Sequence, residues 1–254
     1  MTTSGGTPTS CCGLPVFSRF VEAGRSIAEG LIGLLFPPHC ILCGTRLDSL
    51  RIVCAACEAT LPSLSGPRCR RCGEGVADPS LDLCVRCGTQ ERFVDRFTSL
   101  GPYEGPWGKL VRALKFEKET TIVRFLASRM AAWVHLQEMA NSFDLITFVP
   151  MSPKDRRARG FNQAQLLARG VAKRVGLPMC KTLKKVRHTP AQGRLGARQR
   201  RTNLRDAFEP LRYGRERVLL VDDIGTTGST AEECAKTLKR GGYRSVAVLT
   251  IARA

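Results

Sequence analysis

The sequence is poor in aromatic residues and histidine, and it has no long hydrophobic run. Aromatic residues make up 6% of its 254 residues, and none of the three histidines lies in a recognisable nucleophile setting. The longest apolar stretch, residues 31–36, is far shorter than the ~20 residues that span a bilayer. These absences argue against a membrane-spanning protein and against a hydrolase built on Ser-His-Asp or Cys-His.

The N-terminus lacks the features of a secretory signal. Residues 1–10 contain no Lys or Arg ahead of a weak apolar region, and no clear small-residue cleavage site is present. We therefore expect a cytoplasmic protein. In that compartment cysteines stay reduced and are available to metal ions, whereas disulfides are rare.

Two quantities are unusually high, the net charge and the cysteine count. The formal net charge is +18, and there are twelve cysteines. Residues 151–217 contain 19 Lys and Arg but only 4 Asp and Glu, so this stretch carries +15 of the total. Such a charge favours a polyanionic partner: nucleic acid, a phosphorylated small molecule or an anionic membrane surface.

The sequence divides into three regions. We predict a disordered tail and amphipathic helix over residues 1–36, a cysteine-rich zinc-binding domain over 37–90 and an α/β domain over 91–254. Apolar residues recur at helical spacing from Phe17 to Leu35 and stop at two prolines. Packing on the protein itself suits this helix better than a membrane surface, because its polar face mixes acidic and basic residues.

Eight cysteines form four CxxC pairs at regular spacing. The pairs are Cys40 and Cys43, Cys54 and Cys57, Cys69 and Cys72, and Cys84 and Cys87, with 10, 11 and 11 residues between them. A CxxC turn presents two thiolates to one tetrahedral ion, and two such turns complete a four-cysteine site. The spacing predicts two structural zinc ions, since four thiolates leave no open position for a catalytic water.

Other interpretations of the cysteines are less favoured. A redox CxxC needs a strand–helix setting that is missing here, and disulfides of the secreted type do not suit the expected compartment. Sequential pairing of the turns is favoured over an interleaved arrangement, and the repeat of about thirty residues suggests two stacked zinc ribbons. Cys180 and Cys234 have apolar neighbours and are predicted to be core thiols.

The last region alternates short apolar runs with helical patterns. Strands are predicted at residues 143–150, 218–221 and 245–252, and helices around residues 122–134, 164–175 and 231–240. Apolar strands that alternate with helices indicate a parallel sheet covered on both faces. The predicted fold class is therefore α/β.

The most informative stretch is VLLVDDIGTTGST, residues 218–230. It joins a buried strand, two carboxylates and a Gly/Thr/Ser turn that leads into a helix. Open α/β sheets bind ligands at the carboxyl ends of their strands, and the N–H groups at a helix start suit a phosphate. Adjacent acids would repel that phosphate, so they must face a neutral polyol or a metal. This pattern fits ribose-5-phosphate, and neither a P-loop nor a dinucleotide fingerprint is present.

The stretch resembles the phosphoribosyl-pyrophosphate motif of type I phosphoribosyltransferases. The ComF family shares that motif and adds an N-terminal double zinc ribbon, and RRARGFNQA at residues 156–164 is similar to its RxRGFNQA segment. Residues 103–106, 114–116 and the basic stretch 189–208 also look like their counterparts there. The resemblance covers about residue 36 to the end. It departs at Gly225, where an aliphatic residue is usual, and this change is expected to loosen the loop.

The resemblance implies a type I phosphoribosyltransferase-like parallel sheet flanked by helices, behind a double zinc ribbon. It also implies an enzyme that binds phosphoribosyl pyrophosphate with Mg²⁺. Asp222 and Asp223 would hold the ribose hydroxyls. The turn Pro150, Met151 and Ser152 would hold pyrophosphate with Mg²⁺. The 5′-phosphate would be bound by Thr226, Thr227, Gly228, Ser229 and Thr230.

Arginines on a Gly- and Gln-rich stretch suggest a mobile loop that closes over pyrophosphate and neutralises the leaving group. The arginines in question are Arg198, Arg200, Arg201 and Arg205. The predicted catalytic residues are therefore Asp222 and Asp223 with Arg198 and Arg201. The acceptor stays open between a base, ammonia and a nucleic-acid group, and so does the oligomeric state.

A second basic cluster exceeds what one small substrate needs. Its residues are Lys181, Lys184, Lys185 and Arg187. Together with two zinc ribbons it indicates single-stranded DNA or another nucleic acid as a partner, although aromatic stacking residues are scarce. ComF relatives are associated with DNA uptake. The resemblance therefore also implies a rival function, a non-catalytic nucleic-acid-binding competence factor that only senses a phosphoribosyl ligand.

Overall fold

The computed structural model describes residues 38–47, 51–116, 119–187 and 204–254. The predicted tail and amphipathic helix over residues 1–36 lie outside the described residues. The predicted loop arginines Arg198, Arg200 and Arg201 also lie outside them. Within the described parts of the chain, no helix is long and apolar enough to cross a membrane.

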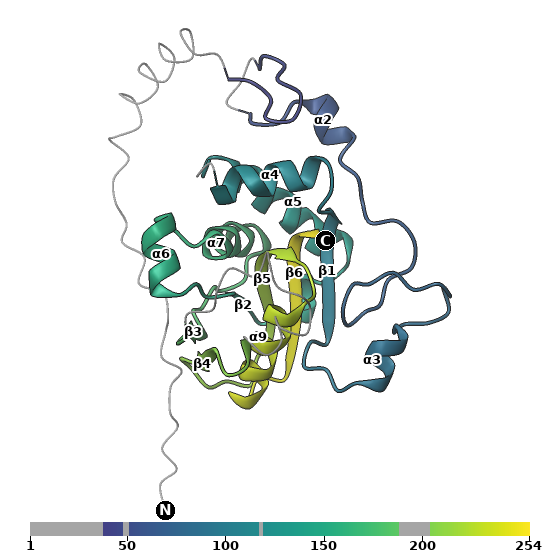
Figure 1. Ribbon diagram of the computed structural model, residues 1–254, viewed down its shortest axis with the longest axis vertical. Helices are drawn as coiled ribbons and strands as arrows, with labels where there is room; N and C mark the ends of the chain where they lie inside the picture. The colour runs from purple at the N-terminus through teal and green to yellow at the C-terminus, as the bar shows by residue number, and fades with distance from the viewer. Residues whose placement is uncertain (1–37, 48–50, 117–118, 188–203) are drawn as a thin grey trace, which may run out of the picture.

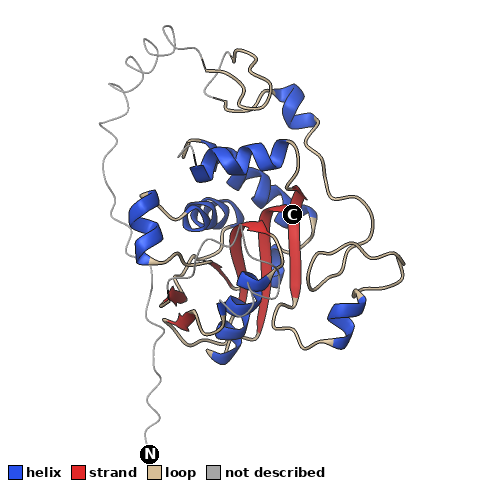
Figure 2. Ribbon diagram, in the orientation of Figure 1, coloured by secondary structure: helices blue, strands red, loops and turns tan. Residues whose placement is uncertain are grey.

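A four-stranded parallel sheet forms the centre of the molecule, in the order β1-β6-β5-β2. The strands are β1 (Arg96–Pro102), β2 (Leu145–Phe148), β5 (Arg217–Gly225) and β6 (Ser245–Arg253). Every residue of β2 is buried, and so is nearly every residue of β6, as the predicted double-sided cover requires. The α/β fold class predicted from the sequence is confirmed (Figure 2).

Helices cover both faces of the sheet (Figure 1). Helices α4 (Pro106–Phe116), α5 (Ile122–Leu136) and α7 (Gln163–Val175) share one apolar core with Leu219 and Val221 of β5. Helix α9 (Ser229–Arg240) and a hairpin of β3 (Leu183–Lys185) with β4 (Phe208–Pro210) share a second core with Val218 and Leu220. Alternate residues of β5 thus face opposite layers.

Strand β5 runs four residues further than the apolar run predicts. Asp222 and Asp223 therefore lie inside the strand and not after it, because the ladder with β6 continues to Gly225. The expectation that Gly225 loosens the loop is wrong. Gly225 is the buried last residue of β5, and a Cβ there would lie 2.3 Å from Cζ of Phe97.

The two cysteine-rich ribbons pack on different parts of the α/β domain. The first includes α2 (Ala55–Ala59), and its buried Leu47 and Val53 join the core beneath α4 and α5. The second includes α3 (Val85–Thr89) and runs beside the edge strand β1, where the Phe97 N–H donates to the Arg70 carbonyl at 2.7 Å. The predicted stacking of the ribbons is wrong, because the two lie apart (Figure 1).

Candidate functional site

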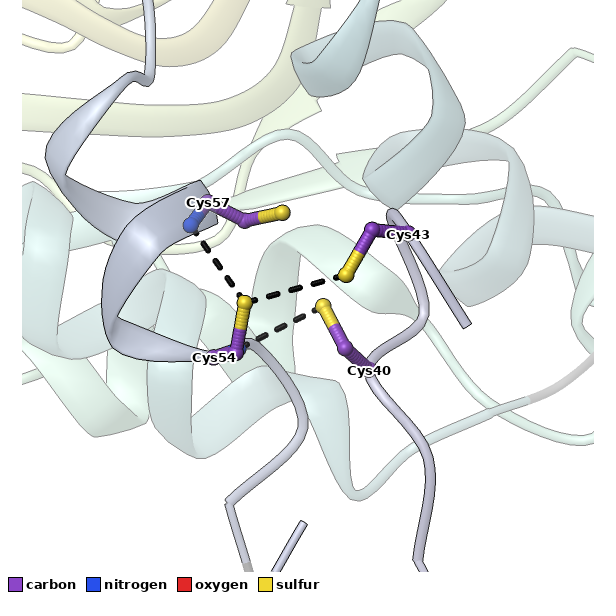
Figure 3. Close-up of side chains that lie close together, drawn as sticks. All are labelled: Cys40, Cys43, Cys54 and Cys57. Atoms are coloured by element: carbon purple, nitrogen blue, oxygen red, sulfur yellow. Dashed lines mark hydrogen bonds between the residues drawn. The ribbon is translucent and has the colours of Figure 1, made fainter. Parts of the chain in front are cut away.

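The CxxC turns pair sequentially into two four-cysteine clusters. Cys40, Cys43, Cys54 and Cys57 form the first (Figure 3), and Cys69, Cys72, Cys84 and Cys87 form the second. Within each cluster the sulfur atoms lie within 4.8 Å of one another. The Sγ atoms of Cys43 and Cys54 are 3.7 Å apart, as are those of Cys72 and Cys84. Two sulfurs bound to one tetrahedral zinc at about 2.3 Å would be about 3.8 Å apart.

The two clusters share one local structure. In each, the first CxxC turn closes with a hydrogen bond from a glycine N–H to the carbonyl of the leading cysteine, from Gly44 to Cys40 and from Gly73 to Cys69, both at 2.8 Å. Both glycines have φ above +70°, a region that side chains with a Cβ rarely adopt. The second CxxC turn of each cluster opens a short helix, at Cys54 or Cys84. This repeated frame supports two structural zinc ions.

Two further described cysteines, Cys180 and Cys234, were predicted to be core thiols, and the structure buries only one of them fully. Cys234 is fully buried on α9, whereas Cys180 is only half-buried. Neither belongs to a cluster.

The two acids of β5 face opposite layers of the sheet. Asp223 points toward α4 and α7, where its Oδ2 accepts 2.9 Å hydrogen bonds from Lys115 Nζ and Gln163 Nε2. Gln163 in turn accepts a 2.9 Å hydrogen bond from Arg159. Asp222 lies on the α9 side, and its Oδ1 accepts the N–H of Asp223 at 2.9 Å. The pair thus presents one carboxyl group to each side of the carboxyl end of β5.

The two carboxyl groups differ in acidity. Burial, followed by the neighbouring Asp223 charge, raises the pKa of Asp222 to about 8. Burial acts on Asp223 as well, but the Lys115 ammonium and the Gln163 amide outweigh it and lower the pKa of Asp223. Near neutral pH and without a ligand, Asp223 is therefore ionised and Asp222 retains its proton.

Asp222→Asn is expected to flatten the pH dependence of stability between about pH 4 and about pH 8. An acid whose pKa rises on folding binds more protons in the folded state than in the unfolded state. Its contribution to the stability of the protein is complete below its unfolded pKa and is lost as the pH rises through its folded pKa. The loss is at most roughly 1.4 kcal/mol per pH unit. Urea denaturation at about pH 5 and about pH 8.5 measures it. If the free energy of unfolding falls equally in wild type and variant between these two pH values, the raised pKa of Asp222 is contradicted.

A turn after β5 forms a small pocket at the start of α9. Ten residues line it: Phe97, Asp222, Ile224, Gly225, Thr226, Gly228, Ser229, Thr230, Ala231 and Thr250. Gly228, at φ +73°, is the N-cap of α9, and the hydroxyls of Thr227 and Ser229 lie 2.8 Å apart. The free N–H groups and hydroxyls of a helix start suit an anion. The structure therefore brings Asp222 and four of the five residues of the predicted phosphate turn, residues 226–230, into one pocket, and the fifth, Thr227, is hydrogen-bonded to Ser229.

The predicted pyrophosphate turn lies beside this site. Residues 150–152 follow β2, the neighbour of β5 in the sheet. Asn162 holds the turn through a 3.1 Å hydrogen bond from its side-chain amide to the Val149 carbonyl. Ser152 is buried and caps α6 (Pro153–Arg159), accepting from the Asp155 N–H at 3.1 Å. All three predicted ligand segments thus lie at the carboxyl edge of the sheet.

The four predicted nucleic-acid residues lie on or beside the β3–β4 hairpin, in unlike surroundings. Lys181, Lys184 and Arg187 are exposed. Lys184 pairs with Glu209 at 2.7 Å, and Arg187 donates to the Arg205 carbonyl at 2.6 Å. Lys185 is half-buried over the Phe208 ring, and burial lowers its pKa although Asp155 and Asp222 act to raise it. Three of the four are thus exposed, and two of these three already have a polar partner.

Lys115 and Gln163 are site residues that the sequence prediction did not assign. Both lie in segments that carry the family resemblance, residues 114–116 and 156–164. Their side chains meet on Asp223 from α4 and α7. A single Lys or Gln in a helical pattern has no motif of its own, so only the packing of these helices reveals the pair.

Part of the chain matches a known family model, and most of it is similar in sequence to known proteins. Residues 31–90 match the family model of the double zinc ribbon domain. Competence protein F of Haemophilus influenzae is 32% identical over 225 residues, covering 85% of this chain and 97% of that protein. DNA utilization protein YhgH of Salmonella typhimurium is 34% identical over 229 residues, covering 87% and 99%. A solved structure of the allosteric regulatory enzyme of purine biosynthesis is 25% identical, with a TM-score of 0.35, over 50% of this chain and 25% of that one.

Proposed function

The chain belongs to the ComF family, and we propose that it binds phosphoribosyl pyrophosphate with Mg²⁺ at the carboxyl ends of β5 and β2. We propose further that it transfers the phosphoribosyl group to an acceptor. The observation that carries this proposal is the pocket that joins Asp222 to the turn before α9, with Asp223 next to it on the same strand. Carboxylates for ribose hydroxyls and helix-start N–H groups for a 5′-phosphate are the two halves of such a ligand's recognition.

In this proposal the residues around the ribose act through charge. Departure of pyrophosphate leaves an oxocarbenium-like ribose, which a nearby carboxylate stabilises. Asp223 is suited to this role because Lys115 and Gln163 keep it ionised and fixed. Asp222 would accept from a ribose hydroxyl on the pocket side. Arg198 and Arg201 are proposed to cover the leaving group.

The donor set at this edge also suits a magnesium ion. Mg²⁺ prefers oxygen ligands, keeps several waters and is usually held by one or two carboxylates together with substrate phosphates. Asp222 supplies a carboxyl oxygen. Burial and the neighbouring Asp223 charge raise the pKa of Asp222 to about 8, and a bound cation would counter both effects and displace the proton. When bound, Mg²⁺ would neutralise charge on the departing pyrophosphate.

Two measurements test this function directly. Calorimetric titration with phosphoribosyl pyrophosphate, with and without Mg²⁺, should show Mg²⁺-dependent binding. Pyrophosphate release in the presence of candidate bases, ammonia or single-stranded DNA should then identify the acceptor. Binding without release for any acceptor would favour a sensor over an enzyme, and absence of binding would refute the proposal.

We propose nucleic acid as a second ligand on the β3–β4 hairpin. The observation that favours it is the exposure of Lys181, Lys184 and Arg187 on one hairpin, outside the phosphate pocket. The names of the relatives, which refer to competence and DNA utilization, agree with it. Lys185 is proposed to serve the small-ligand site instead, because it is half-buried and interacts with the Asp222 charge.

Replacing Lys181, Lys184 and Arg187 by Ala should flatten the salt dependence of single-stranded DNA binding. Each phosphate neutralised contributes about −0.7 to the log–log slope, so loss of up to three contacts should reduce its magnitude by up to about 2. Fluorescence anisotropy across a salt series measures the slope.

A variant with the same charge change controls for net charge. Lys173 near the end of α7, Arg215 just before β5 and Arg244 just before β6 are exposed and lie outside the hairpin. Their replacement by Ala should leave the slope close to the wild-type value. If both variants change the slope equally, the effect is one of net charge and the hairpin is not the binding surface.

A further inference from the structure

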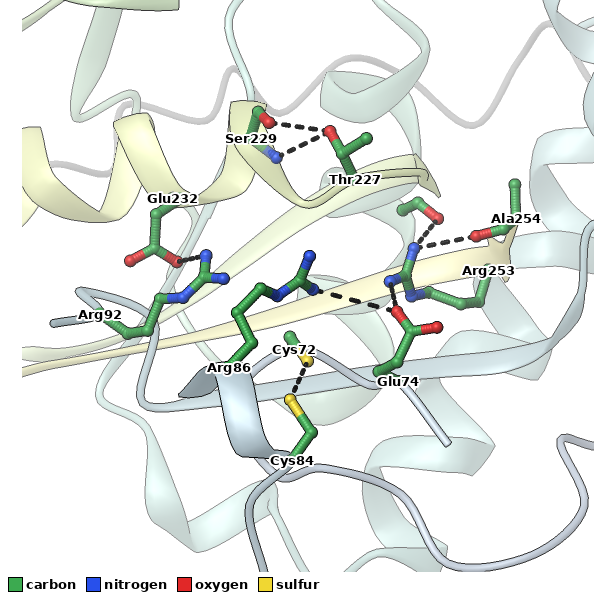
Figure 4. A network of polar contacts seen from close by, with 11 residues as sticks. Cys72, Glu74, Cys84, Arg86, Arg92, Thr227, Ser229, Glu232, Arg253 and Ala254 are labelled. Carbon is green, nitrogen blue, oxygen red and sulfur yellow. Dashed lines mark hydrogen bonds and ion pairs between the residues drawn. The ribbon is translucent and has the colours of Figure 1, made fainter. Parts of the chain in front are cut away.

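The second ribbon reaches the phosphate turn through one buried arginine. Arg253 of β6 donates from one guanidinium nitrogen to the Gly225 carbonyl at 2.9 Å and to the Ala254 carbonyl at 3.0 Å. Its other terminal nitrogen lies 2.9 Å from the Glu74 carboxylate of the second ribbon (Figure 4). The Arg253 side chain is only 7% exposed. The residue that ends β5, where the phosphate turn starts, is therefore tied to a residue two positions after Cys72.

An aromatic ring fills the space between ribbon and turn. A Cβ on Gly73 would lie 2.8 Å from the Phe97 ring, and a Cβ on Gly225 would lie 2.3 Å from it. The ring thus occupies room that a glycine leaves on each side. The Arg253 guanidinium carbon lies 5.7 Å from the ring centroid, and Phe97 itself lines the pocket. Movement of the ribbon would therefore reach the pocket wall through Phe97.

The far side of the turn is tied to the segment that follows the second ribbon. Glu232, in the first turn of α9, accepts the backbone N–H of Phe93 and lies 3.7 Å from the Arg92 guanidinium (Figure 4). Arg92 and Phe93 come three and four residues after the end of α3 at Thr89. The phosphate turn is thus contacted on both sides. Gly225, before it, is linked through Arg253 to the second ribbon, and Glu232, after it, contacts the segment that follows this ribbon.

The first ribbon has no such path within the described residues. Its polar ties go to α4 and α5: Lys109 donates to the Leu42 carbonyl at 3.0 Å, and Arg129 pairs with Glu58 at 3.2 Å. Neither helix lines the pocket. The two ribbons therefore differ in their relation to the phosphate turn, although their local structures repeat.

We propose that Glu74 and Arg253 are positioning residues, through which the second ribbon holds the phosphate turn in its binding conformation. This inference rests on the proposed function for the identity of the ligand. Glu74 is 57% exposed and is a carboxylate partner of a buried cation. Without it, Arg253 would carry an unpaired charge in a buried position, which favours its movement to solvent. The Gly225 carbonyl would then keep only its 2.9 Å hydrogen bond from the Ala254 N–H and would be held less firmly.

Glu74→Ala tests the proposal, with Glu58→Ala as a matched control. Each variant removes the carboxylate of one Arg–Glu pair between a ribbon and the α/β domain, and Glu74→Ala also removes a longer, 4.0 Å contact with Arg86 inside the ribbon. Elemental analysis should show that both variants keep their zinc. We expect Glu74→Ala to weaken calorimetric binding of phosphoribosyl pyrophosphate with Mg²⁺ roughly tenfold, within the 5- to 150-fold range of ordinary coupling. Glu58→Ala should bind like wild type.

Hydrogen exchange provides a readout that needs no ligand. The backbone amides of residues 226–229 should exchange faster in Glu74→Ala than in wild type, and at the wild-type rate in Glu58→Ala. Unchanged exchange in Glu74→Ala, or an equal increase in both variants, would overturn the proposal. If wild type itself fails to bind phosphoribosyl pyrophosphate, the proposed function fails, and the exchange rates still decide whether the ribbon holds the turn.

Discussion

The double variant Asp222→Asn, Asp223→Asn is expected to lose phosphoribosyl pyrophosphate binding. Hydrogen bonds to a charged group are worth about 1.5–3 kcal/mol each, so losing two carboxylates should cost about a hundredfold in affinity or more. Calorimetry in the presence of Mg²⁺ measures this loss. An unchanged affinity would mean that the ribose is held elsewhere.

The single variants should separate binding from stability. Asp222 is protonated near neutral pH in the free protein, so Asn replaces it at little cost to the fold. Asp223→Asn instead leaves the Lys115 ammonium, 23% exposed, without its carboxylate and should destabilise the protein by about 1–3 kcal/mol. Adding Lys115→Met should recover part of that stability.

An acid at the opposite end of β5 provides the control. Asp144 pairs with Arg217 at 2.7 Å, and this hydrogen-bonded partner lowers the pKa of Asp144 to about 2. Asp144 directly precedes β2, and Asp144→Asn removes the carboxylate that pairs with the first residue of β5 without touching the pocket. It should leave affinity unchanged, and a loss like that of the double variant would show that the site responds to strand stability.

The sequence predicts the sheet well where strands are apolar, and poorly elsewhere. Strands β2 and β6 have burial on both sides, and the continuous apolar runs that this requires are visible in the sequence. Strand β1 was missed because RFTSLGP has no such run, although four of its seven residues are buried. Local apolar patterning therefore identifies the strands with a continuous apolar run, including the edge strand β2, and not β1.

Tertiary packing explains what the sequence could not predict about the site. The two adjacent acids read as one pair facing one ligand, but their position inside β5 sends them to opposite layers. Gly225 read as a weakness in a loop, whereas Phe97, 128 positions earlier, takes its space. Contacts over such separations leave no trace in local spacing. The cysteines were predictable because both ligand turns of a cluster lie within twenty residues.

Two zinc ions per chain are expected by elemental analysis, and Cys40→Ser and Cys84→Ser should each remove one. Binding of structural zinc supplies about 10–16 kcal/mol to small domains that cannot fold without it. Cys180→Ser is the matched control, since Cys180 is half-buried and outside both clusters. Two zinc ions in each of the cluster variants would contradict the assignment of four thiolates per ion.

Loss of zinc should affect the second ribbon more severely than the first. The buried apolar core of the second ribbon consists of Cys69, Cys72 and Cys87 themselves, with the partly buried Val76 and Leu83 beside them, so this core depends on the metal. The first ribbon keeps Leu47 and Val53 in the main core under α4 and α5. Limited proteolysis of Cys84→Ser should therefore cut within residues 68–90 rapidly, whereas Cys40→Ser should resist cleavage between residues 51 and 60 for longer. The reverse order would show that burial of Leu47 and Val53 does not stabilise the first ribbon.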